Sequence, residues 1–270
     1  MWGTLRHYAH AVEQRAELLR ETQWLKKRGV RLPPGTERRI WADPAGMAPY
    51  VRLPRFINPD ENVFLIDVGG NTGYWCETFL EFFPKTTVAA FEPVSEAFRQ
   101  YKNRFLQNPG VRVFQVALSD RQGEAPIHVG ESLGRSSLLE YSGAIQEAFK
   151  IGFSGTETVP LNTLDSYPLP LPSKASKTLL KIDVQGHELE VLKGSKNSLP
   201  GIDAALVECS FAEEYKGAPF SFAHIVKLLV DFDLYPIVFG EYDRRLGPYG
   251  WERDVLFVKR PLLDKIWGGS

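Results

Sequence analysis

Two acidic residues that follow apolar strands carry the first chemical signal of this chain. Residues 63–75 read VFLIDVGGNTGYW, an apolar strand that reaches Asp67 and continues into a glycine-rich turn. A second apolar run, 87–91, ends in Glu92, which stands 25 residues after Asp67. Parallel strands bind nucleotide-type cofactors at their carboxyl ends, so we expect both acids at one edge of a sheet. Glu92 is then placed to accept hydrogen bonds from ribose hydroxyls.

The turn between these strands favours a cofactor that carries positive charge. Gly69 and Gly73 let the backbone approach a ligand closely, and Asn71 lies between them. A dinucleotide fingerprint starting at Gly69 would need glycine at position 71 and glycine or alanine at position 74, where the chain has Asn71 and Tyr74. Asp67 would also repel a pyrophosphate, whereas it suits the sulfonium and amine of S-adenosylmethionine. We therefore interpret the turn as an S-adenosylmethionine site, with Asp67 near the methionine end.

Composition indicates an ordinary globular protein without a strong charge bias. The 270 residues are 43% hydrophobic and 24% charged, with a formal net charge of −1. This balance argues against nucleic acid as a partner, because phosphate binding usually needs a basic excess. Cys76 and Cys209 are the two cysteines, and we expect reduced thiols in a cytoplasmic protein. No run approaches the roughly 18 apolar residues that a membrane span needs, and the polar start is unlike a signal peptide.

From Val63 onward, short apolar runs alternate with helical stretches, as in a parallel sheet with crossover helices. Strands are expected at 63–68, 87–91, 111–117, 178–184, 204–209, 234–239 and 253–258. Helices are expected at 74–83, 95–107, 187–193 and 220–232. The 240–252 link is too short for a full crossover helix, so the last two strands should be antiparallel.

Three further segments complete the expected organisation. Residues 1–50 should form an amphipathic helix over about 5–27, followed by an extended lead-in rich in Pro and Gly. The main domain is expected over 51–260, with an insertion at about 123–161 that covers the active edge of the sheet. A tail follows at 261–270. The apolar face of the first helix needs a partner, which a homodimer would supply.

Several segments together resemble the FkbM family of S-adenosylmethionine-dependent methyltransferases. The most specific is LLKIDVQGHELEVLKG over 179–194, and IDAALVECSFAEEY over 202–215 accompanies it. IDVGGNTGYW, AFEP and VALSD add to the likeness, which covers roughly 50–258. The resemblance implies an α/β fold of the Rossmann-like class I methyltransferase type. Its seven-stranded sheet would be mostly parallel, with an antiparallel last strand and helices on both faces.

The resemblance also implies what the protein does. Family members transfer a methyl group, usually to a hydroxyl, on a sugar, glycan or secondary metabolite. An N-methyltransferase acting on a small amine is the alternative within enzymes, since an amine needs less help from a base. A protein that binds S-adenosylmethionine without transferring its methyl group is a third interpretation.

Strand ends receive roles by the same resemblance. The end of the third strand would hold the adenine through Ala117, Leu118 and Ser119. Asp183, at the end of the fourth strand, would reach the methionine moiety or the acceptor. Arg135 and Ser136 lie in a Ser-rich turn that similar proteins carry, where Arg135 either binds an acidic acceptor group or is a solvated charge.

Trp251 lies in the 240–252 link, where it either stacks on a sugar ring or packs within a long hairpin.

An alcohol acceptor must lose its proton, which calls for a general base or a divalent metal. His187 is the leading candidate base, because it opens a helix just past the fourth strand and a helix N-terminus favours the neutral imidazole. In the competing interpretation His187 only packs or caps that helix. Glu208, at the end of the fifth strand, could bind acceptor, base or metal. A metal held by Asp183, Glu208 and His187 is chemically reasonable, but no spacing pattern indicates a metal site.

Overall fold

The main sheet of the protein has seven strands in the order β3-β2-β1-β7-β8-β10-β9. The computed structural model describes residues 2–143, 146–147, 150–168, 176–218, 221–239 and 252–267. The strands are β1 (Asn62–Val68), β2 (Thr86–Phe91), β3 (Val111–Phe114), β7 (Ser176–Ile182), β8 (Ala204–Ser210), β9 (Leu234–Phe239) and β10 (Glu252–Lys259). β10 runs antiparallel to β8 and β9, and the other neighbouring pairs are parallel. The expected sheet and its antiparallel last strand are confirmed.

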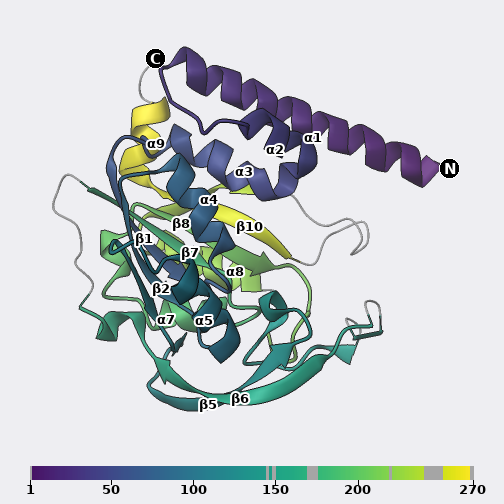
Figure 1. Ribbon diagram of the computed structural model, residues 1–270, viewed down its shortest axis with the longest axis vertical. Helices are drawn as coiled ribbons and strands as arrows, with labels where there is room; N and C mark the ends of the chain where they lie inside the picture. The colour runs from purple at the N-terminus through teal and green to yellow at the C-terminus, as the bar shows by residue number, and fades with distance from the viewer. Residues whose placement is uncertain are drawn as a thin grey trace.

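Helices cover both faces of this sheet, as expected (Figure 1). They are α4 (Tyr74–Phe82) and α5 (Ser95–Arg104) on one face, and α7 (Glu188–Lys193) and α8 (Ser221–Val230) on the other. Successive side chains of a strand point to opposite faces. β1 therefore places Val63 and Leu65 in a core with α4, and Phe64 and Ile66 in a core with α7 and α8.

The insertion is a second, three-stranded sheet in the order β4-β6-β5. It consists of β4 (Ala117–Leu118), β5 (Gly123–Gly130) and β6 (Phe153–Asn162), and β5 and β6 form a long antiparallel hairpin (Figure 1). The prediction of one continuous strand over 111–117 was wrong. After Phe114 the chain leaves the main sheet, and Ala117 and Leu118 pair with Leu161 and Asn162 instead.

The N-terminal region is helical where an extended lead-in was expected. It contains α1 (Trp2–Lys27), α2 (Thr36–Ala42), α3 (Pro44–Arg52) and the 3-10 turn η1 (Leu53–Arg55). The first helix is confirmed, but the extended lead-in was a wrong prediction. Asp43 caps α3 by accepting a hydrogen bond from the Gly46 N–H at 3.0 Å, and Pro44 suits the first turn because its missing N–H is not needed there.

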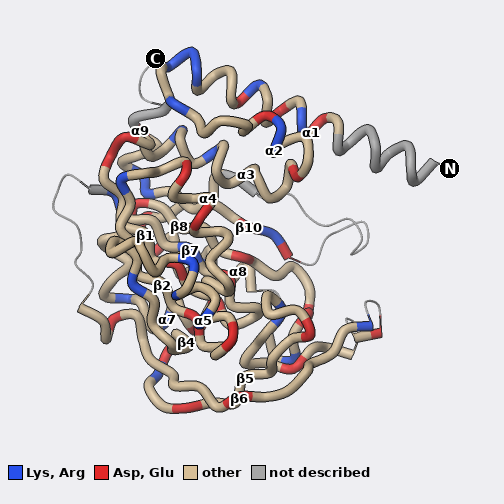
Figure 2. The backbone as a smooth tube through the Cα atoms, viewed as in Figure 1, with Lys and Arg blue, Asp and Glu red and all other residues tan. Residues whose placement is uncertain are grey.

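These N-terminal helices belong to the same hydrophobic core as α4. Leu18, Ile40 and Met47 are buried in that core together with Phe82. Both acidic and basic residues lie on α2 and on the part of α1 that is coloured in Figure 2, and some of them pair across elements, as in the hydrogen-bonded ion pair of Arg52 with Glu17 at 2.9 Å. The proposed homodimer through α1 stays a prediction.

Further short elements complete the chain. The C-terminal α9 (Arg260–Trp267) occupies most of the expected tail and adds Leu262 and Leu263 to the first core. The remaining 3-10 turns are η2 (Leu133–Arg135), η3 (Leu164–Ser166) and η4 (Leu199–Gly201). None of the helices in the described residues combines the length and apolar character that crossing a bilayer requires.

The packing of α1 predicts a stability effect at a site remote from the cavity. Leu18→Ala should lower the free energy of unfolding by about 2–5 kcal/mol, because Leu18 is 2% exposed within the core. Leu106→Ala is the matched control, since Leu106 is 69% exposed and should cost less than about 0.5 kcal/mol. Urea unfolding measures both variants. Equally small losses of unfolding free energy in both variants would mean that the packing of α1 contributes little to the stability of the domain.

Candidate active site

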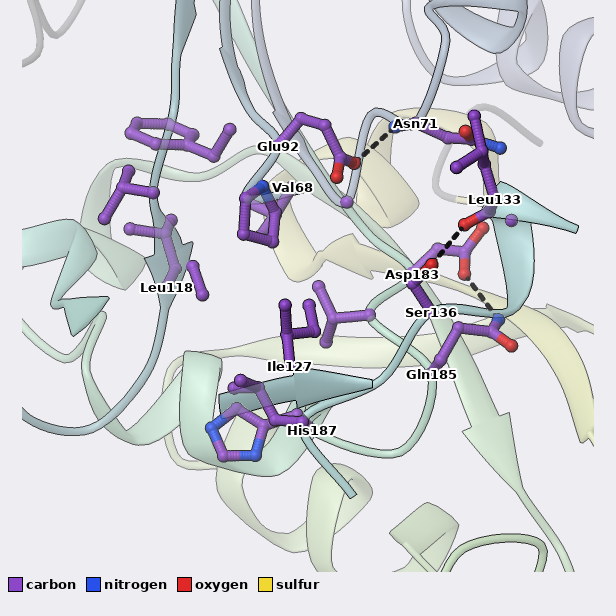
Figure 3. Close-up of a pocket in the computed structure, with 18 residues that line it drawn as sticks. Val68, Asn71, Glu92, Leu118, Ile127, Leu133, Ser136, Asp183, Gln185 and His187 are labelled. Carbon is purple, nitrogen blue, oxygen red and sulfur yellow. Dashed lines mark hydrogen bonds between the residues drawn. The ribbon is translucent and has the colours of Figure 1, made fainter. Parts of the chain in front are cut away.

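A cavity lies at the carboxyl ends of β1, β2 and β7, against the β5–β6 hairpin (Figure 3). Apolar side chains with a few polar groups form its wall, which is the usual composition of a small-molecule site. Eight residues predicted from the sequence line it, namely Gly69, Asn71, Glu92, Ala117, Leu118, Ser136, Asp183 and His187. The apolar wall was missed; it includes Val68, Phe91, Val116, Ile127, Leu133, Leu138 and Val184.

Glu92 is a buried carboxylate on this wall. Its Oε2 accepts a hydrogen bond from the Asn71 N–H at 2.8 Å, and its Oε1 accepts one from the Val94 N–H at 2.9 Å. Burial raises the pKa of Glu92 to about 7, although these two donors act in the opposite direction. Each carboxylate oxygen can accept a second hydrogen bond, so Glu92 keeps capacity for a ligand diol.

The turn after β1 approaches β7 so closely that only glycine fits at position 69. Gly69 has a φ of 73°, and a Cβ there would lie 1.8 Å from the carbonyl oxygen of Asp183. The side-chain oxygen of Asn71 is buried and has no hydrogen-bond partner within the described part of the chain. An unpaired acceptor on a cavity wall suits a ligand donor such as an amine. Gly73 opens α4 but does not line the cavity.

A buried lysine joins the ends of β1 and β7. The Lys181 Nζ donates a hydrogen bond to the carbonyl oxygen of Gly69 at 2.8 Å. It also lies 3.5 Å from Asp67 Oδ1 and 3.6 Å from Asp183 Oδ2. Burial lowers the pKa of Lys181, but the carboxylates of Asp183 and Asp67 outweigh burial and raise it overall. The ammonium therefore stays charged between two carboxylates.

Asp67 is placed differently from the expectation. It is 0% exposed and is not part of the cavity wall. Its Oδ2 accepts a hydrogen bond from the Tyr101 hydroxyl at 2.9 Å, while its Oδ1 faces Lys181. These contacts fix the turn from behind, so direct contact of Asp67 with the methionine end of a cofactor stays a prediction.

Asp183 and Glu208 are brought together by one amide. The Nε2 of Gln185 donates to Asp183 Oδ1 at 3.0 Å and to Glu208 Oε2 at 2.8 Å. Asp183 opens on the cavity, whereas Glu208 does not line it. Burial and the neighbouring Asp183 raise the pKa of Glu208 well above its usual range. Gln185 and Lys181 were both missed from the sequence, although a lysine inside the apolar run LLKID was a visible signal.

Glu188 organises the turn that carries these groups. It is 1% exposed, and its Oε1 accepts hydrogen bonds from the N–H groups of Val184 and Gly186 at 3.1 and 3.0 Å. Burial raises the pKa of Glu188 to about 7. Its role is therefore to hold the strand-to-helix turn, since both donors lie in the turn that precedes α7.

His187 lies at the end of the cavity that was assigned to adenine. Its Nε2 is 3.0 Å from the Ser119 Oγ, and Ser119 directly follows Ala117 and Leu118. Figure 3 shows His187 near Ile127 and well separated from Asp183. Burial lowers the pKa of His187, so the imidazole is neutral at pH 7. Ser119 itself is fully buried and does not reach the cavity wall.

The predicted acceptor residues fall in three different situations. Ser136 lines the cavity, but its Oγ already donates to the Leu133 carbonyl at 2.9 Å and accepts from the Gly130 N–H at 3.1 Å. Arg135 points elsewhere, since it does not line the cavity and its Nη1 lies 4.0 Å from Glu214 Oε1. Trp251 lies outside the described residues.

The three proposed metal ligands do not converge. Asp183 and Glu208 both contact Gln185, while His187 contacts Ser119. Across the residues that the structure describes, no group of three His, Cys, Asp or Glu side chains is arranged to hold a metal ion.

Comparison with known proteins decides the family. The profile of the methyltransferase FkbM domain matches residues 67–235, which is more than half of the chain. The chain belongs to the FkbM methyltransferase family. The resemblance found in the sequence is thereby confirmed, and with it the enzyme class of methyltransferase.

Individual relatives of this FkbM methyltransferase are distant. It is 29% identical over 177 residues to the 2-O-methyltransferase NoeI of Sinorhizobium fredii, covering 63% of this chain and 72% of NoeI. It is 29% identical over 157 residues to the hexuronic acid methyltransferase AglP of Haloferax volcanii, covering 55% of this chain and 56% of AglP. An FkbM methyltransferase structure from Methylobacillus flagellatus aligns with a TM-score of 0.48 at 12% identity, over 90% of this chain and 60% of that one.

The FkbM methyltransferase should bind its cofactor more tightly as Glu92 ionises. A raised pKa means that protonated Glu92 favours the folded state, and that this contribution is lost as pH rises through about 7. An ionised carboxylate accepts stronger hydrogen bonds from ribose hydroxyls. Calorimetry from pH 5.5 to 8.5 should therefore show S-adenosylmethionine affinity rising and then levelling above about pH 7.

Two variants show which carboxyl group causes this pH-dependent rise in S-adenosylmethionine affinity. Glu92→Gln should remove it and weaken binding by about 1–3 kcal/mol. Glu188→Gln is the matched control, since Glu188 is equally buried and also has a pKa of about 7 but lies off the cavity. A step that disappears in Glu188→Gln and persists in Glu92→Gln would remove the ribose assignment.

The buried ammonium predicts a large stability loss. Lys181→Met should lower the free energy of unfolding by about 3–5 kcal/mol, because it leaves Asp67 as a buried charge without a counter-ion. Lys177→Met on the same strand is the control, since its ion pair with Asp203 at 3.0 Å is partly exposed and should be worth about 1 kcal/mol or less. Denaturant unfolding measures both variants. An equal loss in the free energy of unfolding for Lys181→Met and Lys177→Met would contradict the account.

Proposed function

We propose that this protein is an S-adenosylmethionine-dependent O-methyltransferase that methylates a hydroxyl of a sugar, glycan or similar polyhydroxy acceptor. The observation that carries the proposal is Asp183, a carboxylate that opens on the cavity beside the glycine turn. Its two oxygens face the Lys181 ammonium and the Gln185 amide. An ionised carboxylate in this position can accept the proton of an alcohol.

The cavity wall fits the proposed cofactor in its chemistry. Glu92 keeps acceptor capacity for the ribose diol, and Leu118 and its apolar neighbours suit an adenine ring. The unpaired Asn71 oxygen can accept a hydrogen bond from the cofactor's amine. When bound, S-adenosylmethionine supplies an activated methyl carbon on a positively charged sulfonium. The sulfonium suits the neighbourhood of Asp183, where carboxylates outnumber the single ammonium of Lys181.

In the proposed reaction, the residues of the chain position the acceptor and remove its proton. Transfer to the acceptor oxygen would require that oxygen to lie close to the methyl group and in line with its bond to sulfur, so the cavity residues must align the two. As the oxygen–carbon bond forms, the hydroxyl proton passes to a carboxylate oxygen of Asp183. Lys181 and Gln185 hold that carboxylate in place on the cavity wall, so that it can meet the acceptor hydroxyl.

The choice of a hydroxyl acceptor has independent support. One relative is named as a 2-O-methyltransferase and another as a hexuronic acid methyltransferase. A neutral hydroxyl also needs a base, and the cavity offers a suitable carboxylate in Asp183. We propose a cytoplasmic site of action, consistent with the free and buried state of Cys76 and Cys209.

The base role of His187 stays a second proposal. Its imidazole is neutral, which a base requires, but its Nε2 is engaged with Ser119 at 3.0 Å. The contact with Ser119 fits a residue that shapes the end of the cavity assigned to adenine. For that reason we rank Asp183 above His187 as the base.

Activity assays distinguish the two candidates. The acceptor is first found by screening hexoses, uronic acids and amines for a gain of one methyl group in mass. With that acceptor, Asp183→Asn should lower turnover at saturating S-adenosylmethionine by about 10² to 10⁴ fold, a larger effect than its loss of affinity for the cofactor. His187→Ala should weaken cofactor binding more than it lowers turnover at saturation. The reverse pattern, with Asp183→Asn fully active, would transfer the base role to His187.

A further inference from the structure

Gln185 has an unusual concentration of contacts for an uncharged residue. Besides its bonds to Asp183 and Glu208, its Oε1 accepts a hydrogen bond from the Tyr215 hydroxyl at 2.7 Å. Its backbone carbonyl accepts one from the Ser137 Oγ at 2.6 Å. Its φ of 57° lies in the left-handed region, which is uncommon for a residue other than glycine. Such a conformation persists only where the surroundings determine it, and it is frequent at functional sites.

These contacts leave one orientation for the Gln185 amide. Both hydrogens of Nε2 are used, one on Asp183 and one on Glu208. A flipped amide would turn Oε1 toward the two carboxyls, and at least the ionised one would face it with no hydrogen between them, which is unfavourable. The Tyr215 hydroxyl completes the arrangement by donating to Oε1. The amide therefore offers its donors to the two carboxylates and to nothing else.

Tyr215 is itself firmly placed. It stacks on Tyr141 with ring centroids 5.3 Å apart, and Tyr141 stacks on Phe153 of β6 at 4.3 Å. Both tyrosines are 1% exposed. A Cβ on Gly186 would lie 2.7 Å from the Tyr215 ring, so the ring also contacts the turn that carries Gln185. The hairpin of the insertion is thus linked through stacked rings to the Gln185 amide.

The two carboxylates differ in what else surrounds them. Asp183 has the Lys181 ammonium 3.6 Å from its Oδ2, whereas the charged groups that act most strongly on Glu208 are acidic, and Lys181 acts more strongly on Asp183 than on Glu208. The titratable and charged groups around the pair are Lys181, Asp67, Glu188, Glu252 and Asp254, with Glu214 and Arg135 next to Glu252. Two adjacent carboxyls in such surroundings favour one negative charge between them.

We propose that Gln185 is a positioning residue that holds Asp183 and Glu208 side by side as a pair sharing one negative charge, which lies on Asp183, the carboxylate that opens on the cavity beside Lys181. Its neutral amide joins the two carboxyls without adding charge, and Lys181 decides which of them ionises. The inference rests on the proposed base role of Asp183 and adds the group that holds the base in its ionised form.

The test compares a variant of Gln185 itself with variants of the two stacked tyrosines, Tyr215 and Tyr141. Gln185→Glu replaces the donor amide by a third carboxyl, and Tyr215→Phe removes the hydroxyl that fixes the amide. Tyr141→Phe is the matched control, since its hydroxyl donates to the Arg135 carbonyl at 2.8 Å and does not touch Gln185. Infrared spectroscopy of the ligand-free protein follows the protonated carboxyl bands against pH, and Glu208→Gln and Asp183→Asn assign the bands of the pair.

The expected result is a shift of the Asp183 titration to higher pH by about one unit in Gln185→Glu, because ionised Asp183 loses a donor and gains a neighbouring carboxyl. Tyr215→Phe should shift it less and in the same direction, and Tyr141→Phe should leave it unchanged. The acidic limb of the turnover profile should move with the titration, so turnover falls about tenfold per unit at a fixed pH below the midpoint.

Two outcomes separate this inference from the proposed function. Titrations of Gln185→Glu and Tyr215→Phe that match Tyr141→Phe would overturn the role of Gln185, whatever Asp183→Asn does to turnover. Shifted titrations together with a fully active Asp183→Asn would support the role of Gln185 and remove Asp183 as the base. If Gln185→Glu does not fold, the comparison of Tyr215→Phe with Tyr141→Phe decides alone.

Discussion

The site depends on one buried ammonium placed between two strand ends. Lys181 lies inside the sheet, where it is 5% exposed and an unpaired cation would be costly. It contacts Asp67 and Asp183 and donates to the Gly69 carbonyl, so a single group fixes the end of β1, its turn and the end of β7. The turn after β1 and the carboxylate of Asp183, which both line the cavity, are therefore positioned by the same charge.

The second constraint comes from the insertion. Between β3 and β7 the chain forms the β5–β6 hairpin in place of the usual crossover helix. This hairpin supplies Ile127 to the cavity wall. Stacked rings then connect β6 to Tyr215 and, through its hydroxyl, to Gln185. One segment thus covers the cavity and also supports the carboxylates, which explains how a loop-rich region can hold polar groups in defined positions.

Much of the fold could be predicted from the sequence because periodic apolar runs report directly on strands and helices. The strand from Asn62 to Val68 and the antiparallel pairing of β9 and β10 followed from local pattern and linker length. The helices α2 and α3 did not, because their signal lay in one cap at Asp43 within a segment rich in Pro and Gly. The split after Phe114 was also invisible, since β3 and β4 are equally apolar and only tertiary pairing separates them.

The residues of the candidate site could be predicted only where an acidic residue stands at the end of an apolar strand. Glu92 and Asp183 stand at strand ends, and both line the cavity. Lys181 and Gln185 were not predicted as site residues, because their roles depend on partners distant in the sequence. Lys181 pairs with Asp67, and Gln185 accepts a hydrogen bond from Tyr215. His187 looked like a base from its position, but its side-chain direction toward Ser119 is a property of the packed turn.

The most direct test of this account is a crystal structure with S-adenosylhomocysteine, the demethylated cofactor, bound. The account predicts the ribose hydroxyls on Glu92, the adenine against Leu118 and the sulfur directed toward Asp183. A complex in which the sulfur is directed toward His187, or in which the ligand lies outside this cavity, would contradict it.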